Sequence, residues 1–496
     1  MAEQSLKDKT VADTGNLQQS AELCIGALSG AVCDEIARYK VLQGSPELLL
    51  RLTSELRVDV DFVLMDLNAS FLACCKAAAP YAVRYHIKNL NSGIREAYKA
   101  IHGFGKAGKK TVWARLGKAL SDDTVCHYTE QAFLVSKFQK VENVMMAMEG
   151  KLDDKNHRDL TYHYDSNMKD VYQLTVDSSN MEEASQRLID FMSVLQEALK
   201  LCEEVENCLR GNGVDTKVEV ATVQNMDNTR TLAVVQQLRQ NEELQKVLSD
   251  VLNDVKPIDE QAAQMLKLEE LESITAGVVQ LPELSNVFTM LNMWMMLYFM
   301  RADIAAITKA IVMSATSGEA LLNMRRYIIN ITAVFGQLYG YSENQRQGSH
   351  WASIKGMLPV DNQELKEEAA RIEELLKKVT PKRDWDLRTC YVHYYDNTTM
   401  FSNVPNIVEN LIAHDIELEM QRANLMLRVM GLVRDYLNEV MTVLAKQAHE
   451  AREKSTKELK VTLEKIRAIT GNDRCPKDLK EKLTSVVETV ERAIGI

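Results

Sequence analysis

The chain has 496 residues, of which 46% are apolar, enough for sizeable cores in two to four domains at roughly 150 residues per domain. Its formal net charge of −11 argues against a surface that binds nucleic acid everywhere, although a local basic groove is compatible with it. Only 8 prolines occur, none of them between Tyr81 and Lys256, so the composition predicts an all-α fold of long helices.

In chain order, residues 1–20 are polar and carry acidic side chains, which predicts a disordered tail. They contain no apolar signal core, so we expect no secretion through a standard signal peptide. An apolar pattern of helical period begins at residue 21 and continues, past the Gly44-Ser45-Pro46 break, to about residue 207. Residues 21–207 are therefore predicted to form a first helical bundle.

Residues 208–282 are polar and hold two breaks, Arg210-Gly211-Asn212-Gly213 and Lys256-Pro257, which predicts a connector. A second helical bundle is expected over 283–445. The charged residues 446–496 predict a helical tail, broken near Gly471-Asn472-Asp473. The fold prediction is thus two tandem bundles joined by a helical connector, with a charged helical tail.

Residues 287–300, VFTMLNMWMMLYFM, form the most apolar run of the chain. The run is shorter than the roughly 20 residues that cross a bilayer, and Arg301 and Asp303 follow it. We therefore expect a buried core helix and no stable transmembrane segment.

The nine cysteines show no CxxC spacing, and Cys74-Cys75 lies in an apolar stretch that predicts packing. Free thiols in helices suit a reducing compartment, so we expect a cytoplasmic protein. One basic cluster occurs, and we interpret it as a solvated loop leading into a helix. Its members are Lys106, Lys109, Lys110, Arg115 and Lys118.

Landmarks of the two predicted bundles recur in the same order, 230 to 242 positions apart, which predicts an internal duplication. The matched segments are Arg84-Tyr85-His86-Ile87 with Arg326-Tyr327-Ile328-Ile329, His102-Gly103-Phe104 with Tyr339-Gly340-Tyr341, and Trp113-Ala114 with Trp351-Ala352. Aliphatic residues follow both tryptophans at helical spacing, Leu116 and Leu120 in one case, Ile354 and Leu358 in the other.

The last matched pair holds an Arg, four residues and a His. Arg158 and His163 lie in RDLTYHYD, and Arg388 and His393 lie in RTCYVHYYD. A His near neutral pKa can act as general base or acid, and an Arg can hold a phosphate and offset the charge that builds on its oxygens. At a helix start this spacing brings both side chains to one face. These residue types therefore suit cleavage of RNA by its own 2′-hydroxyl.

Both segments resemble the Arg-x4–6-His motif of ribonucleases of the HEPN superfamily, which are small helical bundles. The resemblance covers two short windows in a helical setting. It implies a metal-independent composite site formed by two motifs, with Arg158, His163, Arg388 and His393 as catalytic residues and no cofactor. Polar neighbours would support them: Asp159, Asp165 and Asp396. Thr389 departs from the Asn or Asp that is usual after the Arg, which puts the second half-site in doubt.

Structural roles are the alternative for both motifs, with each His bonded to Asp165 or Asp396 or packed beside the tyrosines. A third loose match, Arg95 to His102, lies inside a predicted helix. Other chemistries lack a pattern, since no Glu-x-x-His pair, zinc spacing or phosphate-binding glycine motif occurs. We therefore expect neither a metal nor a cofactor.

Three functions remain at this point. The first is an endoribonuclease or RNA-binding protein. The second is a non-enzymatic scaffold whose charged helices at 365–378 and 448–490 dock protein partners. The third is a helical pore-forming protein, suggested by the 287–300 run beside long amphipathic helices. The ribonuclease predicts that both motifs converge in one cleft, whereas the scaffold predicts that they lie apart or buried.

Overall fold

The structure, a computed structural model, describes residues 2–104, 110–152, 168–220, 225–255, 282–357, 362–379, 391, 394, 402–471 and 476–494. Every regular element in these residues is a helix and no β-strand occurs among them, which confirms the all-α prediction.

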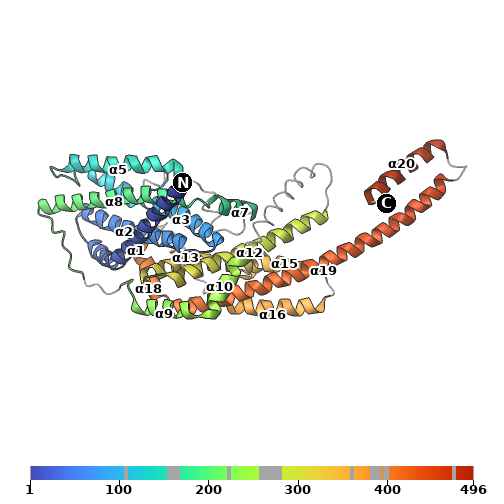
Figure 1. The fold of residues 1–496 in the computed structure, drawn as a ribbon. Coiled ribbons are helices and arrows are strands. Elements are labelled where there is room, and N and C mark those ends of the chain that lie inside the picture. The colour runs from blue at the N-terminus through green and yellow to red at the C-terminus, as the bar shows by residue number, and fades with distance from the viewer. Residues whose placement is uncertain are drawn as a thin grey trace.

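The N-terminal half is built around one buried helix, α2 (Leu48–Lys76), which is buried on every face from Leu49 to Cys74. Within this half it packs against α1, α3, α4 and α8, and Figure 1 shows α1, α3 and α8 beside it. The other helices of this half are α1 (Ala2–Leu42), α3 (Pro80–Ile101), α4 (Val112–Leu120), α5 (Gln131–Leu152), α7 (Met168–Asp177) and α8 (Met181–Gly211). A helix that is buried on every face must have other helices around it, which agrees with this central place.

The C-terminal half is built around α12 (Pro282–Met313), which packs against α13, α19, α10 and α9. Its other helices are α9 (Thr229–Gln240), α10 (Glu242–Asp254), α13 (Ser317–Leu338), α14 (Glu343–Gln347), α15 (His350–Gly356), α16 (Gln363–Val379), α18 (Val404–Ala413) and α19 (Ile416–Thr470). The apolar run predicted as a core helix lies in α12, and it is buried at Met293, at Met295–Leu297 and at Phe299–Met300.

Two predicted boundaries differ from the structure. Residues 2–20, expected as a disordered tail, belong to α1, and the expected connector contains α9 and α10. Leu244, Leu248 and Val251 of α10 are buried at helical spacing, and this helix packs on α12. The apolar stripe is narrow within a polar segment, which is why composition alone suggested a connector.

The two halves share one continuous apolar core instead of forming separate bundles. Helix α12 contacts α2, α3 and α7, while α13 contacts α1 and α2 and α18 contacts α1 and α2. This contact surface between the half formed by α1–α8 and the half formed by α9–α19 is called the junction below.

Helix α19 has 55 residues, about 80 Å at 1.5 Å per residue, and its C-terminal part extends away from the body. Helix α20 (Lys477–Ile494) packs back along it, burying Leu463 and Val487 (Figure 1). The predicted charged tail is thus a helical hairpin continuous with the body.

The matched sequence landmarks occupy corresponding places in the two halves. Helices α3 and α13 each have 22 residues, and each is followed by a glycine with positive φ, Gly103 at 81° and Gly340 at 84°. A short helix follows in each half, with a hydroxyl cap and a buried Trp113 or Trp351 at its second position. These features support the duplication, which itself stays a prediction.

Candidate functional site

The seven residues predicted to form the site lie outside the described part of the chain. They are Arg158, Asp159, His163 and Asp165 of the first motif and Arg388, His393 and Asp396 of the second. The structure describes two close neighbours of His393, Tyr391 and Tyr394, and both are buried.

Tyr394 lies at the junction. Its hydroxyl donates to Oδ2 of Asp66 over 2.6 Å, and the Arg325 guanidinium lies 4.6 Å from its ring centroid. Phe62 of α2 meets the ring edge-on at 6.1 Å, and the Tyr394 carbonyl accepts from the backbone N–H of Asn403 over 2.9 Å. This residue of the second motif segment is therefore held by side chains of the first half.

Asp66 is the centre of a buried charge cluster that joins the halves. Nη1 of Arg325 donates to its Oδ2, and Nη2 of Arg326 donates to its Oδ1 and backbone carbonyl. Burial acts to raise the pKa of Asp66, but Arg326 and Arg325, with the Tyr394 hydroxyl, outweigh it and hold this pKa below its usual value. Asp66 is thus a carboxylate that compensates buried cations from α13.

A second cluster mirrors the first with the halves exchanged. Asp303 of α12, which is fully buried, accepts from the Tyr81 hydroxyl over 2.6 Å, and the Lys88 ammonium lies 3.9 Å from its Oδ2. Tyr81 and Lys88 belong to α3, so each half places an aspartate against the other half. Asp66 and Asp303 are 237 positions apart, within the range of the repeat landmarks.

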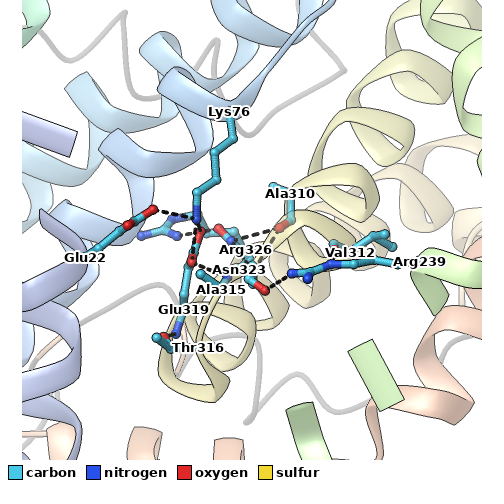
Figure 2. A network of polar contacts seen from close by, with 11 residues as sticks. Glu22, Lys76, Arg239, Ala310, Val312, Ala315, Thr316, Glu319, Asn323 and Arg326 are labelled. Atoms are coloured by element: carbon cyan, nitrogen blue, oxygen red, sulfur yellow. Dashed lines mark hydrogen bonds and ion pairs between the residues drawn. The ribbon is translucent and has the colours of Figure 1, made fainter. Parts of the chain in front are cut away.

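A third polar network closes the end of α12 (Figure 2). The Lys76 ammonium at the end of α2 contacts Glu319 of α13 at 2.8 and 2.9 Å and Glu22 of α1 at 3.4 Å. Burial raises the pKa of Glu319, and Lys76 opposes that shift. Arg239 of α9 donates to the carbonyl of Val312 at the end of α12 and to that of Ser314 just after it. Cations at a helix C-terminus favour its dipole, so this network is structural.

The histidines of the described core are in structural surroundings. His86 is 3% exposed, and burial together with Arg326 lowers its pKa to about 3, so it is neutral at physiological pH. His102, from the third loose motif match, has both ring nitrogens in contact, Nε2 with Glu142 at 3.2 Å and Nδ1 with the Gly103 carbonyl at 3.1 Å. Glu142 also accepts from the Trp113 indole over 2.6 Å. The histidine of this third match is therefore the C-cap residue of α3, with both ring nitrogens in structural contacts.

The other predicted features have the following outcomes. Cys74 is buried, as expected, and every described cysteine is a free thiol. In the basic cluster Arg115 pairs with Glu55 over 2.6 Å, while Lys106 and Lys109 lie outside the described residues. No described helix is long and apolar enough to cross a membrane, and no cluster of metal-ligating side chains occurs in the same residues.

The charged helix at 365–378 is part of α16, which packs on α19. Its apolar face is already covered, since Leu365, Ala369, Ile372 and Leu376 are buried. The hairpin at 448–490 is instead largely exposed. Of the two predicted docking helices, the structure leaves only the hairpin with uncovered apolar side chains, among them Val461, Ile469, Leu479 and Val486, each about half-exposed.

Comparison with protein-family models, with curated proteins and with solved structures gave no match to this chain.

Proposed function

We propose that this protein is a metal-independent HEPN-like endoribonuclease whose composite site combines Arg158 and His163 with Arg388 and His393 at the junction. The observation that carries the proposal is the buried hydrogen bond from Tyr394 to Asp66, because it ties the chain next to His393 to the opposite half.

For the second motif, the support is chain continuity with a residue that lies at the junction. His393 directly precedes Tyr394, and consecutive Cα atoms lie about 3.8 Å apart. Tyr391, two residues before His393, is fully buried as well. A segment anchored on both sides of its histidine is suited to hold that side chain in a fixed position.

The first motif lies between α5 and α7, and α7 also reaches the junction. Tyr172 of α7 packs against Phe299 of α12, with ring centroids 6.0 Å apart, and α7 contacts both α3 and α12. The segment that follows the first motif is therefore anchored to the opposite half too. These two anchors support convergence of the motifs.

The chemistry needs only the proposed residues and the RNA. One His takes the 2′-hydroxyl proton while that oxygen attacks the adjacent phosphorus, and the other His gives a proton to the departing 5′-oxygen. The P–O5′ bond breaks, leaving a 2′,3′-cyclic phosphate and a 5′-hydroxyl. Arg158 and Arg388 offset the charge on the phosphoryl oxygens. Asp165 and Asp396 are suited to orient the histidines.

The test is incubation of the full chain with structured and single-stranded RNAs in excess EDTA, followed by analysis of the product ends. We expect cyclic phosphate ends, and a loss of roughly 100-fold or more in rate for His163→Ala and for His393→Ala. His127→Ala is the matched control, because His127 is exposed on the loop after α4. Intact RNA, or cleavage by both histidine variants at the wild-type rate, would overturn the proposal.

A non-enzymatic scaffold is the second candidate, favoured by the exposed apolar side chains of the α19–α20 hairpin. Helices that extend from a body and present apolar side chains are suited to pair with partner helices. The same RNA assay separates the two functions, since a scaffold leaves every RNA intact.

A further inference from the structure

A cavity of about 360 Å³ lies at the junction, between the α2–α3 connection, α10 and α12. Its volume is at the lower end of the range for small-molecule sites. The lining combines apolar side chains, such as Leu252 and Met313, with a few polar ones. Those polar side chains are Lys76, His86, Ser249, Asn253 and Lys309.

The lining side chains that the structure describes include two lysines and no carboxylate. This is unusual in a chain where acidic residues outnumber basic ones by 70 to 59. Lys76 is neutralised by Glu319 and Glu22, which do not line the cavity. The net positive charge of the cavity lining therefore comes from Lys309.

Lys309 lies half-buried on α12, and its ammonium donates to the amide oxygen of Gln245. No described carboxylate pairs with it, in contrast to Lys76 and Lys88. Burial lowers the pKa of Lys309. A partly desolvated ammonium without a counter-charge is stabilised by an anion that enters the cavity.

The start of α3 faces the same space. Ala79, Pro80 and Ala82 line the cavity, and α3 begins without a side-chain cap. Pro80, the first residue of α3, has no N–H, but the N–H groups that follow it in the first turn have no partner within their own helix, and the dipole of a 22-residue helix adds partial positive charge there. The helix end and Lys309 thus act on one anion together.

His86 adds a third feature. It is 3% exposed, lines the cavity, and hydrogen-bonds the carbonyl of Ala306 through one ring nitrogen. Since that nitrogen donates, the other ring nitrogen of neutral His86 is an acceptor, suited to a ligand hydroxyl. Anion recognition, a hydroxyl acceptor and an apolar wall occur together.

We propose that this cavity binds a nucleoside monophosphate, with the phosphate between Lys309 and the N-terminus of α3 and a sugar hydroxyl against His86. Because α3 belongs to one half and α10 and α12 to the other, the bound ligand strengthens the junction. This site does not depend on the proposed RNA cleavage.

The test is titration calorimetry of the full chain with AMP, GMP, CMP and UMP, beside adenosine and inorganic phosphate, with melting curves for each. We expect saturable binding of at least one monophosphate, weaker binding of phosphate, and a raised melting temperature with the ligand. Lys309→Gln should weaken binding about tenfold or more, whereas Lys309→Arg should keep it.

The matched control is Lys246→Gln, because Lys246 is exposed on α10 and does not line the cavity. The affinity of this variant for the monophosphate should equal that of the wild type. The proposal would be overturned by adenosine binding as tightly as AMP, by unchanged affinity in Lys309→Gln, or by no saturable binding at about 10 mM of any monophosphate. Binding of inorganic phosphate alone would reduce the site to a simple anion site and reject the nucleotide.

Discussion

The Tyr394 hydroxyl and the Asp66 carboxylate meet over 2.6 Å, although 328 positions separate them in the chain. Asp66 also accepts from Arg325 and Arg326, so one buried carboxylate joins the middle of α2, the middle of α13 and the segment beside His393. The integrity of the junction and the position of Tyr394 therefore depend on the same group.

Asp66→Asn should destabilise the protein strongly. The substitution keeps the shape of the side chain but leaves two buried guanidinium groups without their carboxylate, which costs about 3–5 kcal/mol. Urea unfolding measures the difference. Asp250→Asn, at an exposed position of α10, is the control and should leave the midpoint unchanged. Equal midpoints for the two variants would show that Asp66 does not hold the junction.

Tyr394→Phe tests the link between the junction and the proposed activity. The lost hydroxyl removes a buried hydrogen bond worth about 1–2 kcal/mol. If His393 is catalytic, RNA cleavage should fall about 10- to 100-fold, because residue 394, which follows His393, is no longer held by Asp66. The rate is measured well below the melting temperature of the variant. Cleavage at the wild-type rate would mean that Tyr394 does not position the motif.

The raised pKa of Asp61 leads us to expect that the stability of the protein depends on pH. Burial, with repulsion from Glu35, raises its pKa to about 7, above the value of about 3.9 in the unfolded chain. The folded state then binds a proton that the unfolded state loses, so Asp61 lowers stability as the pH rises from about 4 to about 7.

Asp61→Asn removes this titration. The variant should gain stability over the wild type progressively between about pH 4 and pH 7, with no further gain above that, at about 1.4 kcal/mol per pKa unit. Urea unfolding across this range provides the measurement. The other carboxyls of this region whose pKa values burial raises, Glu35, Glu55 and Asp59, are present in both proteins. A stability gain that does not change with pH would contradict a raised pKa of Asp61.

Gly340 and Gly213 form a matched pair of positive-φ glycines, at 84° and 85°. A Cβ on Gly340 would lie 2.7 Å from the backbone carbon of Gln345, whereas one on Gly213 would meet nothing within 4 Å. In both alanine variants the new residue must adopt the left-handed conformation, which costs about 1–2 kcal/mol of stability. Gly340→Ala should lose clearly more stability, because the backbone near Gln345 must also move. Equal melting temperatures would rule out this steric cost.

Removal of residues 447–496 should leave the body folded. The buried residues of α19 that pack on the body run from Ile416 to Val440, whereas Leu463 is buried against α20. We expect an almost unchanged unfolding midpoint and a smaller hydrodynamic radius. A chain that ends at residue 428 is the contrast, since it also loses Met430, Val433 and Leu437. Unfolding of the first truncation would show that the hairpin stabilises the body.

Local patterns were enough to predict the helical class and several landmarks. Scarce proline, the apolar run in α12, and the Trp113 and Trp351 positions follow from helical period and composition. The junction could not be predicted in this way. Arg326 was matched to Arg84 as a repeat landmark, but its partner Asp66 lies 260 positions away, and no local pattern encodes such a pairing. A helical connector was expected at α9 and α10, but their packing against α12 was not, because only a narrow stripe of each helix is buried.

Each half buries an aspartate against cations of the other half, and this affects how the protein behaves when it is diluted. Two separate subunits with such an interface would associate in proportion to their concentration, and each alone would expose Asp66 or Asp303 without its partners. Here both halves belong to one polypeptide, so their association is intramolecular, with a local concentration set by the linking segment. The protein can therefore remain assembled at the lowest copy number, one molecule per cell, where a dimer of independent subunits would come apart.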